Sequence, residues 1–200
     1  MDVVGHLEEL RRRILVVLAV FVVLSIVLFS QGRPLLAIAQ QPAAGLIKEF
    51  IFITPTEVFV SYLKVVMLAA FILSFPLLAF QGWAFLGPAF SPEAQRHVWI
   101  WLAFAVLCFF GGAAFAYFIV LPAALKFLLL FGEGLATPAI SLAKYVSFFG
   151  ALILVGGATF EIPVVMGLLA QTGIINAPML RATRKYAVIV ILVIAYAVRR

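Results

Sequence analysis

Four long apolar runs constrain this chain more than any other feature of its sequence. They cover residues 14–30, 65–86, 98–121 and 145–170. Each is long enough to cross a bilayer as a helix, which takes about 17–25 residues. None alternates apolar and polar residues as the strands of a membrane barrel would. Because a bilayer offers the backbone no hydrogen-bond partners, the runs predict transmembrane helices. We therefore expect an all-α, polytopic membrane protein with one domain over residues 1–200.

The composition agrees with a protein that has lipid as its solvent. The chain is 66% hydrophobic and 11% charged, whereas soluble domains are about 45–50% apolar and 25% charged. The net charge is +6, but the basic residues lie in short loops and form no contiguous patch of the kind that binds nucleic acid. A fifth run, 186–198, reaches only about 20 Å as a helix, too short for the bilayer core. It predicts a shortened fifth span with no sixth span after it.

The basic residues between the runs predict the orientation. Arg11, Arg12 and Arg13 directly precede the first run, and basic residues next to a span favour the cytoplasmic side. The same region, with small residues at 37–39, also has the pattern of a cleavable signal peptide. Its apolar stretch is longer than such peptides use, and acidic residues precede it. We expect an uncleaved first span with the N-terminus in the cytoplasm, in a cell membrane.

Prolines within or beside the runs predict bent helices. Pro76, Pro122 and Pro163 each remove a backbone donor. Between the spans, residues 34–48 and 122–131 are rich in apolar side chains, and we expect short helices there that lie at the membrane interface.

Paired glycines within two of the runs predict close helix contacts. The pairs are Gly111-Gly112 and Gly156-Gly157. Glycine removes side-chain bulk and lets two helix backbones approach each other. Bent helices with such contacts indicate a curved, concave bundle.

The segment before the first run contains two charge pairs at helical spacing. Glu8 with Arg12 and Glu9 with Arg13 are i,i+4 pairs in the favourable orientation. In one interpretation these charges only anchor an interfacial helix. In the other, one carboxylate stays free to receive a cationic ligand. Spacing alone leaves both interpretations open.

A second carboxylate lies on the same predicted side of the membrane. Glu93 follows Ser91-Pro92, so a place in the first turn of a helix is a sufficient structural reason for it. Together with Glu9, however, it offers two carboxylates to a pair of guanidinium groups. Arginine binds carboxylates through two parallel hydrogen bonds, which makes such contacts selective.

Glu161 is the only charged residue of the 145–170 run. A carboxylate at the centre of a bilayer costs about 2.5–3.5 kcal/mol on insertion scales. We expect it to contact a partner helix in the membrane, unless its own bundle satisfies it, for example through Thr159. A proton-coupled transporter is the alternative function for such a group, but the inverted repeats of that class are not visible.

Catalytic, metal and cofactor sites are not predicted. His6 and His97 lie in loops or helix ends, and Cys108 is the one cysteine. The spans lack the histidine and the paired acids that intramembrane proteases use.

Short motifs along nearly the whole chain resemble one family, the TatC subunits of the twin-arginine protein translocase. The segments that carry the resemblance are His6 to Arg13, Thr54-Pro55-Thr56-Glu57-Val58-Phe59 with Lys64, Ser74-Phe75-Pro76, Gln81 with Trp83-Ala84-Phe85, Pro88-Ala89, Ala114-Phe115-Ala116-Tyr117-Phe118 with Leu121-Pro122, Phe160-Glu161-Ile162-Pro163, and Arg184-Lys185-Tyr186.

The resemblance implies a glove-shaped, six-span receptor that binds the twin-arginine signal peptides of folded exported proteins. It implies an oligomeric complex in membrane lipid with TatA- and TatB-type single-span subunits. Transport would use the proton-motive force, without nucleotide hydrolysis. A membrane scaffold with no ligand of its own is the remaining alternative.

The resemblance also assigns residues. It implies signal-peptide binding at Glu9 with its neighbours His6, Leu10 and Arg11. The family's second carboxylate falls on Ala94 in an ungapped count, so Glu93 would have to replace it from one residue earlier. The intramembrane polar contacts would be Gln81 and Glu161. The structural residues would be Pro55, Glu57, Pro76, Pro122 and Pro163.

Overall fold

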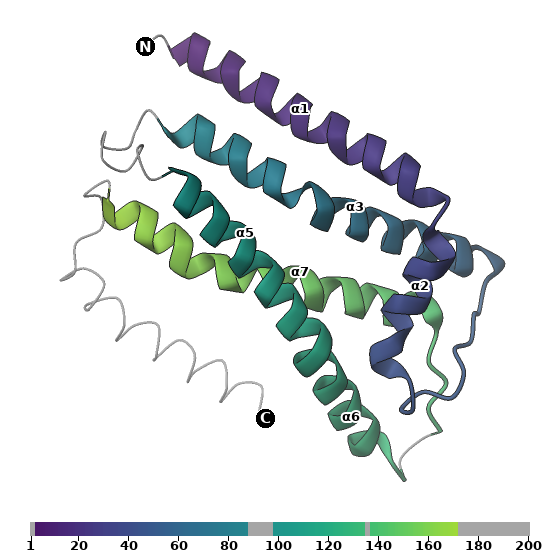
Figure 1. The fold of residues 1–200 in the computed structure, drawn as a ribbon. Helices are drawn as coiled ribbons and strands as arrows, with labels where there is room; N and C mark the ends of the chain where they lie inside the picture. Colours follow the sequence, from purple (N-terminus) through teal and green to yellow (C-terminus); the bar gives the residue numbers. More distant parts are fainter. Residues whose placement is uncertain (1–2, 88–97, 135–136, 172–200) are drawn as a thin grey trace.

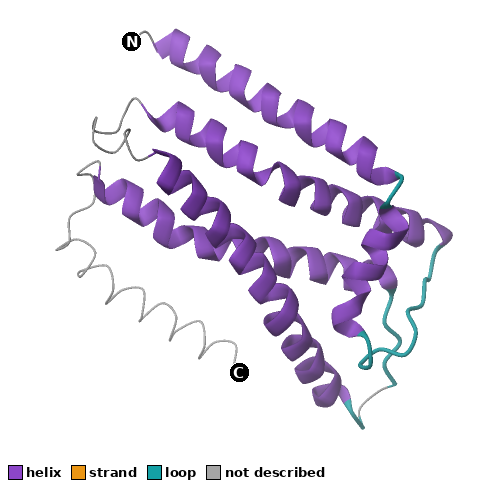
Figure 2. Cartoon of the chain, in the orientation of Figure 1, coloured by secondary structure: helices purple, strands orange, loops and turns teal. Residues whose placement is uncertain are grey.

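The computed structural model describes residues 3–87, 98–134 and 137–171, and these ranges are almost entirely helical (Figures 1 and 2). Four helical stretches are long and apolar enough to cross a membrane, which confirms the four predicted spans. The fifth run at 186–198 and the loop with Glu93 lie outside the described residues. In chain order the elements are α1 (Val3–Phe29), α2 (Gly32–Gln40), the short η1 (Gln41–Ala43), α3 (Pro55–Leu86), α5 (Val98–Phe115), η3 (Ala116–Val120), α6 (Leu121–Gly132) and α7 (Leu142–Gln171).

Helix α3 begins earlier than the apolar run predicts. Pro55 is its first residue, where the preset φ suits a helix and the missing N–H is not needed. Glu57 lies in the first turn, where a carboxylate complements the helix dipole. The helix then continues through Pro76 to Leu86, and α7 likewise contains Pro163.

The two predicted interfacial helices differ from expectation. Residues 122–131 are helical, but α6 continues directly from α5 through the π-helical turn η3, so the prediction of a separate helix there is wrong. The wide turn lies just ahead of Pro122, which has no N–H for a regular helical bond. The other helix, α2, ends well before residue 48. Gly45 adopts a positive φ of 83°, a conformation that stops a helix and suits glycine.

The buried core lies at the end of the bundle away from the N-terminus. Here α2 packs on α3, α7 packs on α3 and α5, and η1 packs on α6. Buried Tyr145 donates a hydrogen bond of 2.6 Å to the Ala39 carbonyl, and Tyr117 donates one of 2.8 Å to the Ile38 carbonyl. The loop before α3 joins the start of α7 through backbone bonds of Ile51. This end is therefore held by directional bonds as well as by apolar packing.

Helix α1 lies at the edge of the bundle and packs mainly on α3 (Figure 1). No residue of its most apolar window is buried. Val23 and Ile26, for example, are 59% and 68% exposed. Such a face would be costly in water but suits lipid or another apolar helix. The chain is thus a multi-pass membrane protein with a weakly covered first helix.

The closest helix contact lies between α5 and α7, and glycines make it possible. A Cβ on Gly112 would collide with the Gly156 carbonyl and would approach the Phe160 Cβ to 2.8 Å. A Cβ on Gly156 would lie 2.8 Å from the Gly112 carbonyl oxygen. A Cβ on Gly111 would meet nothing within 4 Å. The prediction of close contact is confirmed for Gly112 and Gly156, and Gly111 faces away.

This asymmetry gives a matched pair of substitutions. Gly112→Ala should lower the free energy of unfolding by about 1–3 kcal/mol, because overpacking a tight contact forces the backbones apart. Gly111→Ala should not lower it, since alanine is the better helix former and the space is open. Unfolding in detergent micelles, followed by circular dichroism, measures both. Equal effects of the two substitutions would contradict this account of the contact.

Candidate functional site

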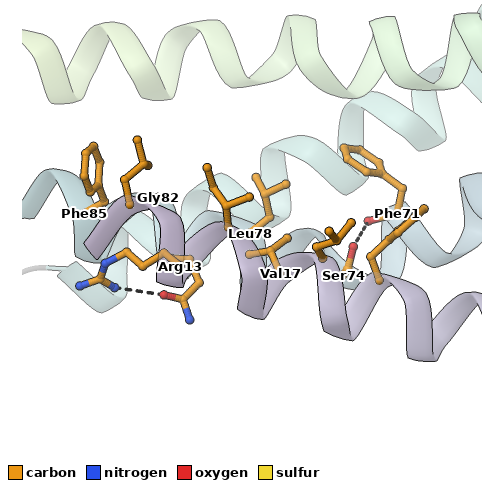
Figure 3. A pocket seen from close by; sticks show the side chains of 12 residues that line it. Arg13, Val17, Phe71, Ser74, Leu78, Gly82 and Phe85 are labelled. Atoms are coloured by element: carbon orange, nitrogen blue, oxygen red, sulfur yellow. Dashed lines mark hydrogen bonds between the residues drawn. The ribbon is translucent and has the colours of Figure 1, made fainter. Parts of the chain in front are cut away.

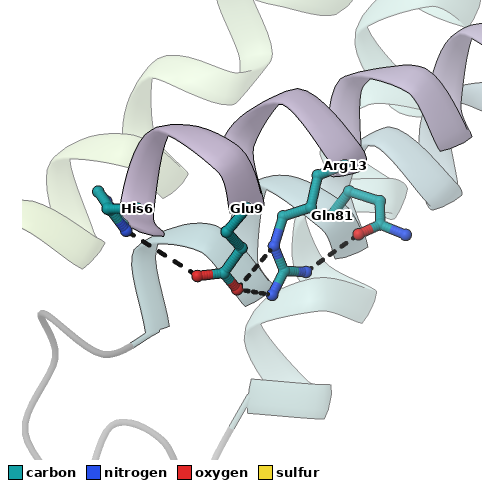
Figure 4. Close-up of polar contacts among 4 residues, drawn as sticks. All are labelled: His6, Glu9, Arg13 and Gln81. Atoms are coloured by element: carbon teal, nitrogen blue, oxygen red, sulfur yellow. Dashed lines mark hydrogen bonds and ion pairs between the residues drawn. The ribbon is translucent and has the colours of Figure 1, made fainter. Parts of the chain in front are cut away.

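A polar cluster joins α1 to α3 at the N-terminal end of the bundle (Figure 4). Arg13 donates from Nε and from Nη2 to the same oxygen of Glu9, Oε1, with an Nε–Oε1 distance of 3.1 Å. Its third nitrogen, Nη1, donates to Gln81 Oε1 at 3.0 Å. His6 Nδ1 lies 3.9 Å from the other carboxylate oxygen, Glu9 Oε2. One guanidinium therefore connects a carboxylate on α1 to an amide on α3.

Helical spacing and helix direction explain the cluster. His6, Glu9 and Arg13 follow one another at i,i+3 and i,i+4, which places them on one face of α1. The start of α1 lies beside the end of α3, so Gln81 comes within hydrogen-bonding distance of Arg13. The His6 ring also stacks on Phe85 of α3, with centroids 4.2 Å apart.

The pair is only half-buried, with the side chains of Glu9 and Arg13 41% and 23% exposed. Solvent screens an ion pair at such an exposed carboxylate, and holding the two side chains in one geometry costs conformational entropy. The contact is therefore weak enough to exchange for a ligand.

The structure distinguishes the two charge pairs that spacing left equivalent. Glu9 pairs with Arg13, whereas Glu8 and Arg12 are exposed and show no ion pair in the part of the chain that the structure describes. Glu8, Arg11 and Arg12 line an open surface hollow on α1 that Glu9 also borders, and they make no hydrogen bond or ion pair with the cluster among the described residues. Arg11 is thus close in sequence to the cluster but does not take part in it.

An apolar groove of about 430 Å³ extends from the cluster between α1 and α3 (Figure 3). Arg13 and Gln81 lie at its polar end. Ser74 also lines it, but its hydroxyl donates to the Phe71 carbonyl at 2.9 Å. The apolar lining comes from both helices: Leu10, Ile14, Val17, Leu18 and Phe21 from α1, and Phe71, Leu78 and Phe85 from α3. This shape suits a ligand with a polar head and an apolar continuation.

Glu161 lies on α7 beside Cys108 and Phe109 of α5. Its Oε1 atom is buried and has no hydrogen-bond partner among the described residues. Thr159 donates to the Val155 carbonyl at 2.7 Å, so it is not the partner of that oxygen. The carboxyl group therefore keeps an unused acceptor in the apolar part of the bundle.

The predicted structural residues lie mainly at the opposite end. Glu57 accepts a 2.8 Å hydrogen bond from Ser141, which ties the start of α3 to the start of α7. The hydrogen bonds of Tyr145 and Ser141 were not predicted from the sequence. A tyrosine within an apolar run was the available signal, because a buried phenol needs an acceptor. Among the described residues, no group of three or more His, Cys, Asp and Glu side chains is placed to hold a metal ion.

The fold and the cluster define a class: a multi-pass helical membrane protein with a carboxylate–guanidinium site at one end of an apolar groove. A family model described as "Sec-independent protein translocase protein (TatC)" matches residues 5–199. The chain belongs to the TatC family.

Individual relatives agree over nearly the whole chain. A TatC protein of Carboxydothermus hydrogenoformans is 34% identical over 98% of this chain and 81% of its own length. A TatC protein of Aquifex aeolicus is 36% identical, with 97% and 82% covered. A crystal structure of the twin-arginine translocase receptor TatC in the detergent DDM superposes with a TM-score of 0.85. It is 36% identical and covers 96% of this chain and 87% of that one.

Proposed function

We propose that this chain is the receptor subunit of a twin-arginine protein translocase and that Glu9 receives an arginine of the signal peptide. The observation that carries the proposal is the partly exposed Glu9 carboxylate, which pairs with Arg13 where Arg13 lines the end of the groove between α1 and α3. The family membership supports it, as does the similarity to the crystal structure of a twin-arginine translocase receptor.

The chemistry of the cluster suits this ligand. A carboxylate binds a guanidinium through two parallel N–H···O bonds, which an ammonium group cannot reproduce. Glu9 is partly exposed, so a peptide can reach it without opening the bundle. The groove next to the cluster has an apolar lining that includes Leu10. This lining would accept the apolar residues that follow the arginines in a signal peptide.

A second contact at Glu93 remains part of the proposal. Glu93 lies outside the described residues. Two arginines bind best to two carboxylates, and this chemistry supports a second contact there. This arrangement requires the N-terminus of α1 and the loop with Glu93 to share the cytoplasmic side, as the basic residues before the first span favour.

The proposed membrane partners are single-span subunits of the TatA and TatB type. A partner helix that carries a polar group would satisfy Glu161 Oε1, which has no partner among the described residues and is costly to bury alone. Neither a proton-coupled transporter nor a passive scaffold is favoured, because neither needs the carboxylate cluster at the head of the groove.

The role of Glu9 can be tested with a neighbour as control. Glu9→Gln should weaken binding of a twin-arginine peptide about tenfold or more, since it replaces charge-assisted hydrogen bonds with weaker neutral ones. Glu8→Gln makes the same charge change on an exposed residue and should have little effect. Fluorescence anisotropy with Arg-Arg and Lys-Lys peptides measures both. Equal losses in the two variants, or no preference of the wild type for Arg-Arg, would refute the assignment.

The contact at Glu161 can be tested by photocrosslinking. A photoreactive side chain at position 161 should crosslink to a single-span partner in membranes that contain the translocase. Ile162 is 57% exposed and points elsewhere, so it serves as the control position. Glu161→Gln should reduce export less than Glu161→Ala, because an amide still offers a donor and an acceptor. Crosslinks confined to the chain itself would assign Glu161 to its own bundle.

A further inference from the structure

The carboxylate that the proposed function needs is already occupied by a guanidinium of the same chain. Arg13 directs two of its nitrogens to Glu9 Oε1 and a third to Gln81 (Figure 4). Among the described residues, the contact of the remaining oxygen, Oε2, is with His6 Nδ1 at 3.9 Å. Arg13 thus presents to Glu9 the same chemical group that a signal-peptide arginine would bring.

Two arginines cannot both use this carboxylate fully. The strong arrangement of a guanidinium on a carboxylate uses both oxygens through parallel bonds. While Arg13 holds Oε1, an incoming guanidinium has only Oε2 and is limited to a single contact. A lysine ammonium is different, because it is a compact charge that can bind one oxygen.

We propose that Arg13 is an internal competitor of the signal peptide: it occupies Glu9 in the free receptor, and a signal arginine must displace it to bind through both oxygens. The inference rests on the proposed function, since it assigns a role at the same site. The binding free energy of a signal arginine is then the difference between its own contact with Glu9 and the Arg13 contact that it replaces. Because these two contacts are alike, the signal peptide stays reversibly bound.

Gln81 gives the displaced side chain a second anchor. Its amide oxygen accepts a 3.0 Å bond from Arg13 Nη1, which is the nitrogen that does not contact Glu9. The bond to α3 can therefore persist while the bonds to Glu9 are broken. The pair is half-exposed, so water can solvate both groups during the exchange.

Three possible roles of Arg13 predict different results when it is neutralised. If Arg13 competes, Arg13→Gln strengthens binding of an Arg-Arg peptide and leaves a Lys-Lys peptide unchanged, because lysine binds without displacing it. If Arg13 positions Glu9, the same change weakens Arg-Arg binding. If Arg13 only repels cations, both peptides gain equally.

The experiment measures the affinities of fluorescent Arg-Arg and Lys-Lys signal peptides for the full chain in lipid nanodiscs. The pH is about 8, where histidine is neutral. Arg12→Gln is the control, since it removes an equal charge from a neighbour outside the cluster. Relative to that control, Arg13→Gln should raise the Arg-Arg affinity about 2- to 5-fold, the range expected for loss of a half-exposed ion pair. Gln81→Leu leaves every charge in place but removes the anchor of the displaced Arg13, so it should lower the Arg-Arg affinity slightly.

A weaker Arg-Arg affinity in Arg13→Gln would overturn the inference, and so would equal gains for both peptides or a gain that Arg12→Gln reproduces. The proposed function is judged separately, from the wild type and Glu9→Gln. If the wild type prefers Arg-Arg and Glu9→Gln loses that preference while Arg13→Gln shows no gain, only the competition is wrong. If the wild type shows no preference, both proposals fail.

Discussion

The constraint on which the structure depends is that a bilayer supplies no hydrogen bonds to the backbone. Each span must satisfy its own N–H and C=O groups, so the described spans are helical throughout. Where a proline removes a donor, neighbouring geometry adapts, as in the π-helical turn η3 just before Pro122. Because lipid is as apolar as the side chains, close packing rather than water exclusion holds α5 to α7, and Gly112 and Gly156 set that distance.

The two ends of the bundle are held in different ways, and the difference suits a receptor. At the far end, the phenols of Tyr145 and Tyr117 and the carboxylate of Glu57 make hydrogen bonds between elements distant in sequence. At the N-terminal end, α1 is joined to α3 by a half-exposed ion pair, one amide contact and a ring stack. A rigid end holds the helices in register, while the other end keeps groups that can change partners.

The sequence predicted the spans well, since span length and composition depend on the bilayer rather than on tertiary contacts. The prediction of a separate helix over 122–131 was wrong, because an apolar segment between spans has the same sequence pattern whether it bends away or continues α5. It also could not choose between Glu8 with Arg12 and Glu9 with Arg13. That choice depends on Gln81, which is distant in sequence and reaches Arg13 only because α1 and α3 run side by side. Family resemblance predicted Glu9 as the signal-binding carboxylate, and the i,i+4 spacing allowed its pairing with Arg13 without favouring that pair over Glu8 with Arg12.

Glu9 and Glu161 differ in burial, and this difference decides which kind of contact each carboxylate can make. Glu9 is partly exposed and already paired, so a ligand gains only the difference between its own contact and that of Arg13. Glu161 has a buried oxygen without a partner among the described residues, so any donor that reaches it relieves a desolvation cost. The first arrangement favours exchange with a soluble peptide that must later leave. The second favours an enduring contact with a helix that stays in the membrane. The two proposed roles, recognition by Glu9 and helix assembly at Glu161, follow from this difference in burial.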